Sequence, residues 1–165
     1  MSNVRYEFPK YKLTQQLKEP GGVAVADAVD AAKANLTDLE PECISELHKA
    51  TAAALAEFQR FPSAFDAASL QALYAISARA VGIGAVCGAP AADTTFISLC
   101  NLLDHLMAIK RWDVEAIAVH VQTLQLLVAN IGKLTPPVME QILAGLEKVT
   151  RRYRQEAASA QAASA

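Results

Sequence analysis

Apolar residues recur at intervals of three and four positions through most of this 165-residue chain. In the segment VAVADAVDAAKANL, for example, Val25, Val29 and Leu36 keep this rhythm, which places them on one side of a helix. No stretch of useful length alternates apolar and polar residues as a half-buried strand does. The pattern therefore excludes an α/β fold. It predicts an all-α protein: an antiparallel four-helix-bundle core with an N-terminal arm and one or two extra helices.

Proline, glycine and capping residues divide this pattern into separate helices. Pro41 suits the first turn of a helix, and Asp66 or Ser63 can cap the helix that follows the break at Pro62. We expect helices from residue 23 to 36, from Pro41 to Arg60, from the Asp66 or Ser63 cap to about Val86, from near Asp93 or Thr94 to Met107, from Asp113 to Ile131, and from Pro136 or Pro137 to about Tyr153.

Composition divides the chain into three parts. Residues 1–22 contain prolines and glycines that disfavour a long helix, yet apolar side chains such as Phe8 and Leu13 predict an N-terminal arm that packs along the body. Residues 23–154 form the predicted helical bundle domain. Residues 155–165, with the sequence QEAASAQAASA, offer few apolar anchors and predict a flexible Ala/Ser-rich tail.

Charge and apolar content narrow the class of protein. A composition of 53% hydrophobic residues suits a domain with a real core, whereas a net charge of −2 gives no electrostatic case for nucleic acid. No apolar run reaches the roughly 18 residues that a transmembrane helix needs, and the polar N-terminus lacks the apolar centre of a signal peptide. Three widely spaced cysteines, Cys43, Cys87 and Cys100, favour reduced buried thiols over a disulfide or zinc site. We expect a cytoplasmic protein that binds neither nucleic acid nor a membrane.

The three histidines form no recognisable reaction centre. His48 and His120 fall beside apolar stripes, which favours hydrogen-bonded positions within the bundle. His105 points away from the apolar stripe of its helix and beside Asp104, so we expect it to be exposed and treat it as the candidate phosphoacceptor. No pair has metal-ligand spacing, and no phosphate-binding loop or serine–histidine–acid order is present. We therefore expect no metal, no cofactor and no enzymatic activity.

One helical segment, LYAISARAVGIG, has a side made of small residues. Its large residues, Leu73, Ile76 and Ile83, form an apolar stripe. The other side carries the residues that we expect to bind a partner: Tyr74, Ala75, Ala78, Arg79, Gly82 and Ala85. Small side chains let another surface approach closely, but they equally suit packing against another helix of the same chain or a second subunit. The sequence leaves both interpretations open.

Residues Leu73 to Leu106 resemble the histidine phosphotransfer domains, which carry a hydrophobic-His-x-hydrophobic-Lys-Gly-x-Ala stretch ending in hydrophobic-Gly. The matching positions are Ile76, Ala80, Ile83 and Gly84 on one helix and Cys100, Leu103 and Asp104 on a later one. Tyr74 stands at the position of the phosphoryl-accepting histidine, Ser77 at that of the lysine and Ala78 at that of the glycine. The interval from Gly84 to Asp104 is also longer than in the family. The resemblance implies a phosphotransfer-like bundle that has lost its phosphorylation site.

A broader stretch, covering most of residues 12–130, is similar to the small chemotaxis-associated proteins called CheE. It comprises KLTQQLKEPGGVAVADAVDAAKANL, the helix with the small side, and SLCNLLDHL with WDVEAIAVHVQTLQLL. This similarity implies a place in a bacterial sensory cluster. Together the two resemblances imply a non-catalytic signalling adaptor of a two-component or chemotaxis system that docks a receiver or histidine-kinase domain.

Other functions stay open at this point. The chain could be an active phosphotransfer protein with a displaced acceptor histidine, or a structural protein that forms homo-oligomers through its alanine-rich face. It could also bind a small molecule in a pocket lined by Phe58, Phe65, Phe96 and Trp112. The favoured role for Trp112 is a lid over one end of the bundle, with a partner contact as the alternative.

Overall fold

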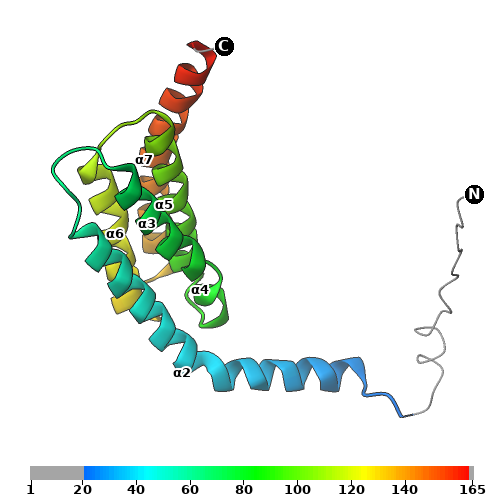
Figure 1. Cartoon of the computed structure of the whole chain (residues 1–165). Coiled ribbons are helices and arrows are strands. Elements are labelled where there is room, and N and C mark those ends of the chain that lie inside the picture. Colours follow the sequence, from blue (N-terminus) through cyan, green and yellow to red (C-terminus); the bar gives the residue numbers. More distant parts are fainter. Residues whose placement is uncertain (1–20, 164–165) are drawn as a thin grey trace, which may run out of the picture. The chain divides into compact units, whose positions relative to one another are not determined.

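The computed structural model describes residues 21–163, and every regular element within them is an α-helix (Figure 1). The predicted all-α class is therefore confirmed. The helices are α2 (Val25–Phe58), α3 (Ala67–Ala80), α4 (Ile83–Val86), α5 (Pro90–Ala108), α6 (Val114–Ala129) and α7 (Pro136–Ala163).

Helix α5 is the centre of the core. It packs against α3, α4, α6 and α7, and its apolar residues cover most of its circumference, leaving one exposed stripe through Thr94, Asn101 and Asp104. Phe96, Leu99, Leu102, Leu103 and Leu106 are all fully buried. The core is thus organised around one helix with four neighbours. The antiparallel four-helix core remains a prediction.

Helix α2 is continuous where the sequence predicts two helices. The predicted break before Pro41 is wrong, because Pro41 lies inside α2. An interior proline has no N–H to donate to the carbonyl one turn earlier, and it destabilises a helix by about 3 kcal/mol. The residues around it, Leu39, Glu40 and Glu42 among them, are good helix formers that carry the helix through.

The chain divides into two compact units, the first ending at Leu36 and the second beginning at Thr37. The predicted bundle domain over residues 23–154 stays a prediction. In the first unit the apolar side chains of Val23, Val25, Val29 and Leu36 are exposed. The predicted N-terminal arm lies, apart from Gly21 and Gly22, outside the described residues.

The predicted helix ending near Val86 is interrupted. Val81 is extended and Gly82 has a φ of 99°, a left-handed value that favours glycine, so α3 stops and α4 starts in a new direction. Asp93 holds this turn from within α5. Its carboxylate accepts hydrogen bonds from the backbone N–H groups of Gly82 (3.0 Å), Gly84 (2.9 Å) and Ala85 (2.7 Å). Asp93 lies in the first turn of α5, which begins at Pro90, so it is near the helix start as predicted, and its carboxylate also caps α4.

Two predicted caps and one predicted start are confirmed. The Asp66 carboxylate accepts from the N–H groups of Ala68 and Ser69 at the start of α3. Asp113 accepts from the N–H of Ala116 (3.1 Å) at the start of α6. Helix α7 begins at Pro136, as predicted. These signals are local and can be read from a few neighbouring residues.

Helix α7 is longer than predicted. The segment from Gln155, predicted as a flexible tail, is helical through Ala163, and both Tyr153 and Ala157 are buried. Only Ser164 and Ala165 of that predicted tail fall outside the described residues.

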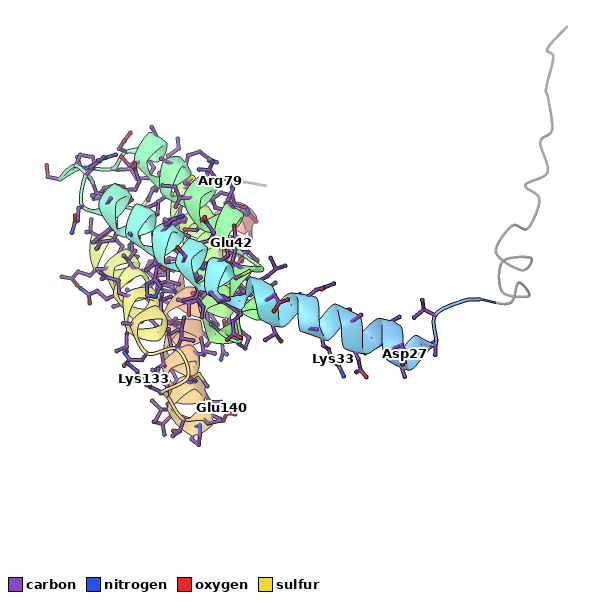
Figure 2. All side chains as sticks on the ribbon, turned by 90° about the horizontal axis from the view of Figure 1, so that it is seen from below. Asp27, Lys33, Glu42, Arg79, Lys133 and Glu140 are labelled. Atoms are coloured by element: carbon purple, nitrogen blue, oxygen red, sulfur yellow. The ribbon has the colours of Figure 1, made fainter. Side chains whose placement is uncertain are left out.

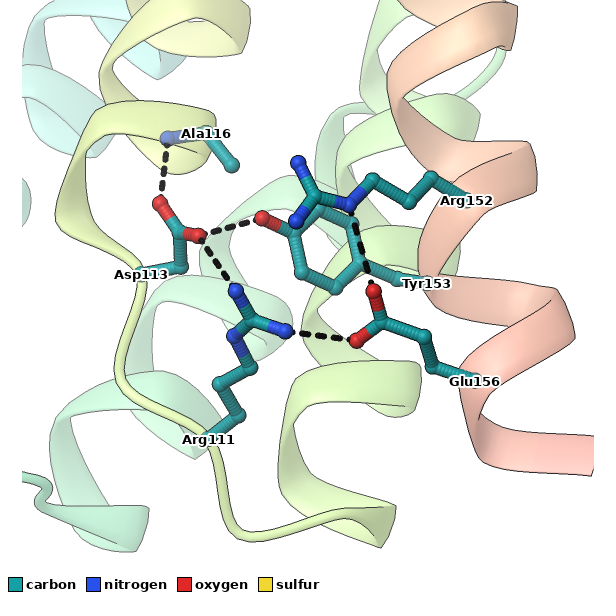
Figure 3. Close-up of polar contacts among 6 residues, drawn as sticks. All are labelled: Arg111, Asp113, Ala116, Arg152, Tyr153 and Glu156. Carbon is teal, nitrogen blue, oxygen red and sulfur yellow. Dashed lines mark hydrogen bonds and ion pairs between the residues drawn. The ribbon is translucent and has the colours of Figure 1, made fainter. Parts of the chain in front are cut away.

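A polar cluster anchors this part of α7 to the start of α6 (Figure 3). The Tyr153 hydroxyl donates to the Asp113 carboxylate. Arg111 pairs with Asp113 (3.7 Å) and with Glu156 (2.6 Å), and Glu156 also accepts from Arg152 (3.1 Å). The guanidinium groups of Arg111 and Arg152 lie 5.3 and 5.7 Å from the centre of the Tyr153 ring.

The electrostatics of this cluster favour a charged Asp113 and a neutral Tyr153. Burial would raise the pKa of Asp113, but hydrogen bonds from Tyr153 and Ala116 and the charge of Arg111 outweigh it and hold that pKa below its ordinary value. Burial, together with the hydrogen bond to Asp113, raises the pKa of Tyr153 to about 12. The basic segment around Tyr153 is therefore partly built into the fold.

Replacing Tyr153 with Phe tests this anchor. Tyr153→Phe keeps the buried ring but removes a donor to a charged carboxylate, so we expect a loss of about 1–2 kcal/mol in the free energy of unfolding. Tyr74→Phe is the control, because the Tyr74 hydroxyl makes no hydrogen bond with the described residues. Urea denaturation followed by circular dichroism measures both. Equal stability of Tyr153→Phe and the unsubstituted chain would contradict the anchoring role.

Gly84 provides a second test, of the packing between α4 and α5. A Cβ at Gly84 would lie 2.4 Å from the Ala89 carbonyl oxygen and 3.0 Å from Asp93 Oδ1. We expect Gly84→Ala to cost about 1–3 kcal/mol, because the backbone must shift. Gly145→Ala is the matched control: it lies in α7 with no atom within 4 Å of its new Cβ, and should gain about 0.5–1 kcal/mol. A stabilised Gly84→Ala chain would show that the α4–α5 contact is loose.

Candidate functional site

The predicted partner-binding residues lie on α3, on α4 and at the turn between them. We call Tyr74, Ala75, Ala78, Arg79, Gly82 and Ala85 the small-residue face. All of them are exposed except Tyr74, which is half-buried and packs against the core. No helix among the described residues covers Ala75 or Ala78, so the structure does not support internal packing of this face.

Two helices contribute to the small-residue face, and its geometry depends on α5. The break at Gly82 places Ala85 on α4 and the other residues on or just after α3. Asp93 fixes the direction of α4 through its three backbone hydrogen bonds. The Arg79 side chain lies back along its own helix, with Nε donating to the Ala75 carbonyl (3.2 Å). Ser77 points the other way, fully buried, and its hydroxyl donates to the Leu73 carbonyl (2.8 Å).

A groove of about 540 Å³ runs beside this face, between α2 and the α3–α4 turn. We call it the α2–α4 groove. Its lining residues are Leu39, Glu42, Cys43 and Glu46 on one side and Val81, Gly82, Ile83 and Val86 on the other. The aliphatic side chains of Leu39, Val81 and Val86 are 39–47% exposed. A fully solvated surface rarely gathers such side chains, and their grouping is typical of a protein-binding site.

The cysteines have the environment of structural thiols. Cys87 and Cys100 are buried and free, as predicted, while Cys43 is half-buried in the α2–α4 groove. Burial, followed by the charge of Asp104, raises the pKa of the Cys100 thiol to about 11. Burial also raises the pKa of Cys87. Both thiols stay protonated at neutral pH and are poor nucleophiles.

Two of the three histidines differ from their predicted positions. His48 was expected on the buried side of its helix but is exposed, because the buried side of α2 runs through Leu47, Thr51 and Ala54. His105 was expected to be exposed and is half-buried. Neither residue belongs to the small-residue face. His48 instead lines a second groove, of about 270 Å³, between α2 and α6.

His120 is hydrogen-bonded inside the protein, as predicted, and it is fully buried. Its Nδ1 lies 2.9 Å from the Ala116 carbonyl oxygen, which can only accept, so Nδ1 carries the hydrogen. Its Nε2 is therefore an acceptor, 3.1 Å from Ser98 Oγ and 3.3 Å from Thr150 Oγ1. The two hydroxyls lie 3.0 Å apart. This network ties α5, α6 and α7 together.

Sequence reasoning missed Ser98 and Thr150. They lie 22 positions before and 30 positions after His120, so no local pattern links them. The only available signal is a hydroxyl residue beside the apolar stripe of its own helix, which is common in any helix. Their role becomes visible once three helices pack.

The aromatic residues near the end of α2 pack against one another. The Trp112 ring stacks on Phe61, with ring centres 5.1 Å apart, and meets the edge of Phe65 at 6.1 Å. Trp112 also packs against the hydrophobic core, and its role as a lid over one end of a bundle stays a prediction. Of the residues expected to line a small-molecule pocket, Phe58 and Phe65 join this aromatic group through Phe61 and Trp112, and Phe96 is fully buried in the core.

Metal and membrane binding have limited structural support in the described part of the chain. It contains no group of three or more His, Cys, Asp or Glu side chains able to hold a metal ion.

One stretch, Ala67–Val86, is long and apolar enough to span a membrane by length and composition, which corrects the expectation that no segment qualifies. That stretch includes the break at Gly82, and Leu70, Leu73 and Ala80 within it are buried in the core. A core helix of a soluble protein passes the same test.

Comparison with known proteins adds no further identification: no family model, no curated protein and no solved structure matches the chain.

Burial of His120 predicts a specific dependence of stability on pH. Desolvation lowers its pKa in the folded state, although the bond to Ala116 acts in the opposite direction. Below pH 6.5 the unfolded chain therefore binds a proton that the folded chain does not. As the pH is lowered from 6.5, the free energy of unfolding should therefore decrease by at most about 1.4 kcal/mol per pH unit, until the pH reaches the pKa of His120 in the folded state.

Urea denaturation between pH 7.5 and pH 5 measures this slope, at about half-unit steps. His120→Gln should flatten it, whereas His48→Gln, at an exposed position on α2, should leave it unchanged. An equal slope in the His120→Gln chain and the unsubstituted chain would assign the pH dependence to other groups.

Proposed function

We propose that this chain is a non-catalytic signalling adaptor that binds another protein domain on the small-residue face of α3 and α4. The observation that carries the proposal is the exposure of Ala75, Ala78, Gly82 and Ala85 side by side on α3, α4 and the turn between them. Side chains this small let a partner helix approach the backbone closely. Tyr74 and Arg79 border them and are of the residue types that contribute most binding energy at interfaces.

We propose a receiver or histidine-kinase domain as the partner, within a bacterial two-component or chemotaxis system. The support is the resemblance of residues 73–106 to histidine phosphotransfer domains, whose equivalent helix binds such domains. In this chain Tyr74 occupies the acceptor position, and Ser77, at the lysine position, is buried. A partner bound here would find no imidazole to phosphorylate. The adaptor would hold its partner without exchanging a phosphoryl group.

Other groups support a non-catalytic role. The thiols of Cys87 and Cys100 have raised pKa values. The nitrogens of His120 are both engaged with protein groups. The alternative of active phosphotransfer would need His48 or His105 as a displaced acceptor, because His120 is fully buried. Self-association through the same face is the second alternative.

Ala78→Glu tests the binding face directly. It places a long charged side chain at the centre of the face, so binding should weaken by about ten-fold or more. The free energy of unfolding should change by less than about 0.5 kcal/mol, as for other exposed sites. Ala144→Glu, at an exposed position of α7, adds the same charge away from the face and is the matched control. Calorimetric titration with receiver and kinase domains encoded beside this gene measures the affinities.

The other outcomes are informative. Unfolding of Ala78→Glu would mean that the face is packed, and would overturn the proposal. A concentration-independent oligomer in light scattering that Ala78→Glu dissociates would make the face a self-association surface. Stable phosphoryl label from a phosphorylated receiver, abolished by His105→Gln or His48→Gln, would establish phosphotransfer instead.

A further inference from the structure

We propose that the α2–α4 groove binds an amphipathic helix of the partner protein, with aliphatic anchors on one side and Lys or Arg along one edge. This inference rests on the proposed function, since it names the part of the partner that enters beside the small-residue face. The groove and the face meet at Gly82, which belongs to both. A domain docked on the face could therefore place one of its helices in the groove.

The two walls of the groove differ strongly in charge. On the α2 side the groove is lined by the carboxylates of Glu42 and Glu46, and residues 38–46 contain no basic residue. Glu46 pairs with Lys49, one turn further along (2.7 Å). The opposite segment, residues 67–89, contains Arg79 as its single charged residue. A ligand that spans the groove therefore meets negative charge along one edge and aliphatic side chains along the other.

The aliphatic part of the groove suits helical anchors. Leu39, Val81 and Val86 are partly exposed, and Ile83 and Cys43 are half-buried beneath them. Side chains at i, i+3 or i+4 and i+7 of an amphipathic helix form a stripe that fits such a groove. Basic residues beside that stripe would lie along the acidic edge that contains Glu42. This charge complementarity selects a basic helix over an acidic one.

The same features argue against other ligands. One wall is helix α2 and the other is the α3–α4 turn with α4, and no strand lies among the described residues, so the groove offers no strand edge for an extended peptide. The acidic wall would repel the phosphates of a nucleic acid or of an anionic membrane. A zwitterionic membrane surface could also contact the aliphatic residues, so the experiment must distinguish membrane binding from helix binding.

Two synthetic peptides serve as probes. Each is a fluorescein-labelled amphipathic helix of about 14 residues, or four turns, one built from Leu and Lys and the other from Leu and Glu. Fluorescence anisotropy with the full chain should show binding of the Leu–Lys peptide and at least about ten-fold weaker binding of the Leu–Glu peptide. Equal affinity for the two peptides would overturn the inference.

Matched variants locate the binding site. Glu42→Lys should weaken binding of the Leu–Lys peptide by about ten-fold, whereas Glu140→Lys, which changes the net charge equally from an exposed position on α7, should not (Figure 2). Val86→Ser should weaken binding as well, while Val138→Ser, with the same exposure (41% against 42%), should leave it unchanged. Circular dichroism establishes that each variant is folded. Equal weakening by both lysine variants, or by both serine variants, would mean non-specific attraction and overturn the inference.

A vesicle arm and the Ala78→Glu chain separate the remaining outcomes. Co-sedimentation with phosphatidylcholine vesicles that Val86→Ser abolishes would reassign the groove to a membrane and overturn the inference. If Ala78→Glu blocks the partner domain while Glu42→Lys and Val86→Ser leave the peptide bound, the groove inference fails and the proposed function stands. If the groove variants release the peptide while Ala78→Glu leaves domain binding intact, the proposed docking face fails.

Discussion

The burial of α5 is the constraint on which the rest of the structure depends. A helix that hides Phe96, Leu99 and Leu103 completely must be covered on several sides, and α3, α4, α6 and α7 supply that cover. Each buried side chain of this size contributes about 1.5–3 kcal/mol through removal from water. No other helix of the described residues has so many neighbours, so the positions of the outer helices follow from their contacts with this one.

Polar side chains of α5 then orient its neighbours where apolar contact alone would not. Asp93 accepts three backbone hydrogen bonds from the α3–α4 turn, and Ser98 joins His120 of α6 and Thr150 of α7. Hydrogen bonds are directional, whereas apolar burial is not. The candidate surface on α3 and α4 therefore depends on a carboxylate that lies outside it. Loss of Asp93 would disturb the direction of α4 before it disturbed the core.

The small-residue face lies on α3 and α4, and two grooves lie beside α2. One groove of about 540 Å³ separates α2 from the α3–α4 turn, and a second of about 270 Å³ separates it from α6. Leu47 and Ala54 hold α2 to the core as fully buried anchors. A groove lies on each side of α2, one facing the α3–α4 turn and the other facing α6. The fold depends on α5 and the helices packed around it, whereas the surfaces that we assign to partners consist of exposed residues on α2, α3 and α4.

The sequence by itself determined the helical class and the helix starts at Asp66, Asp113 and Pro136, because apolar periodicity and caps act over a few neighbouring residues. It also identified the small side of α3, since helical spacing places Ala75 and Ala78 together. Only the tertiary structure decided the rest. The turn at Gly82 is held by Asp93, 11 positions later, which accepts a hydrogen bond from its N–H, and Tyr153 of α7 is held by Asp113, 40 positions earlier, which accepts from its hydroxyl. Such partners are distant in the chain, and nothing local to either residue specifies that they meet.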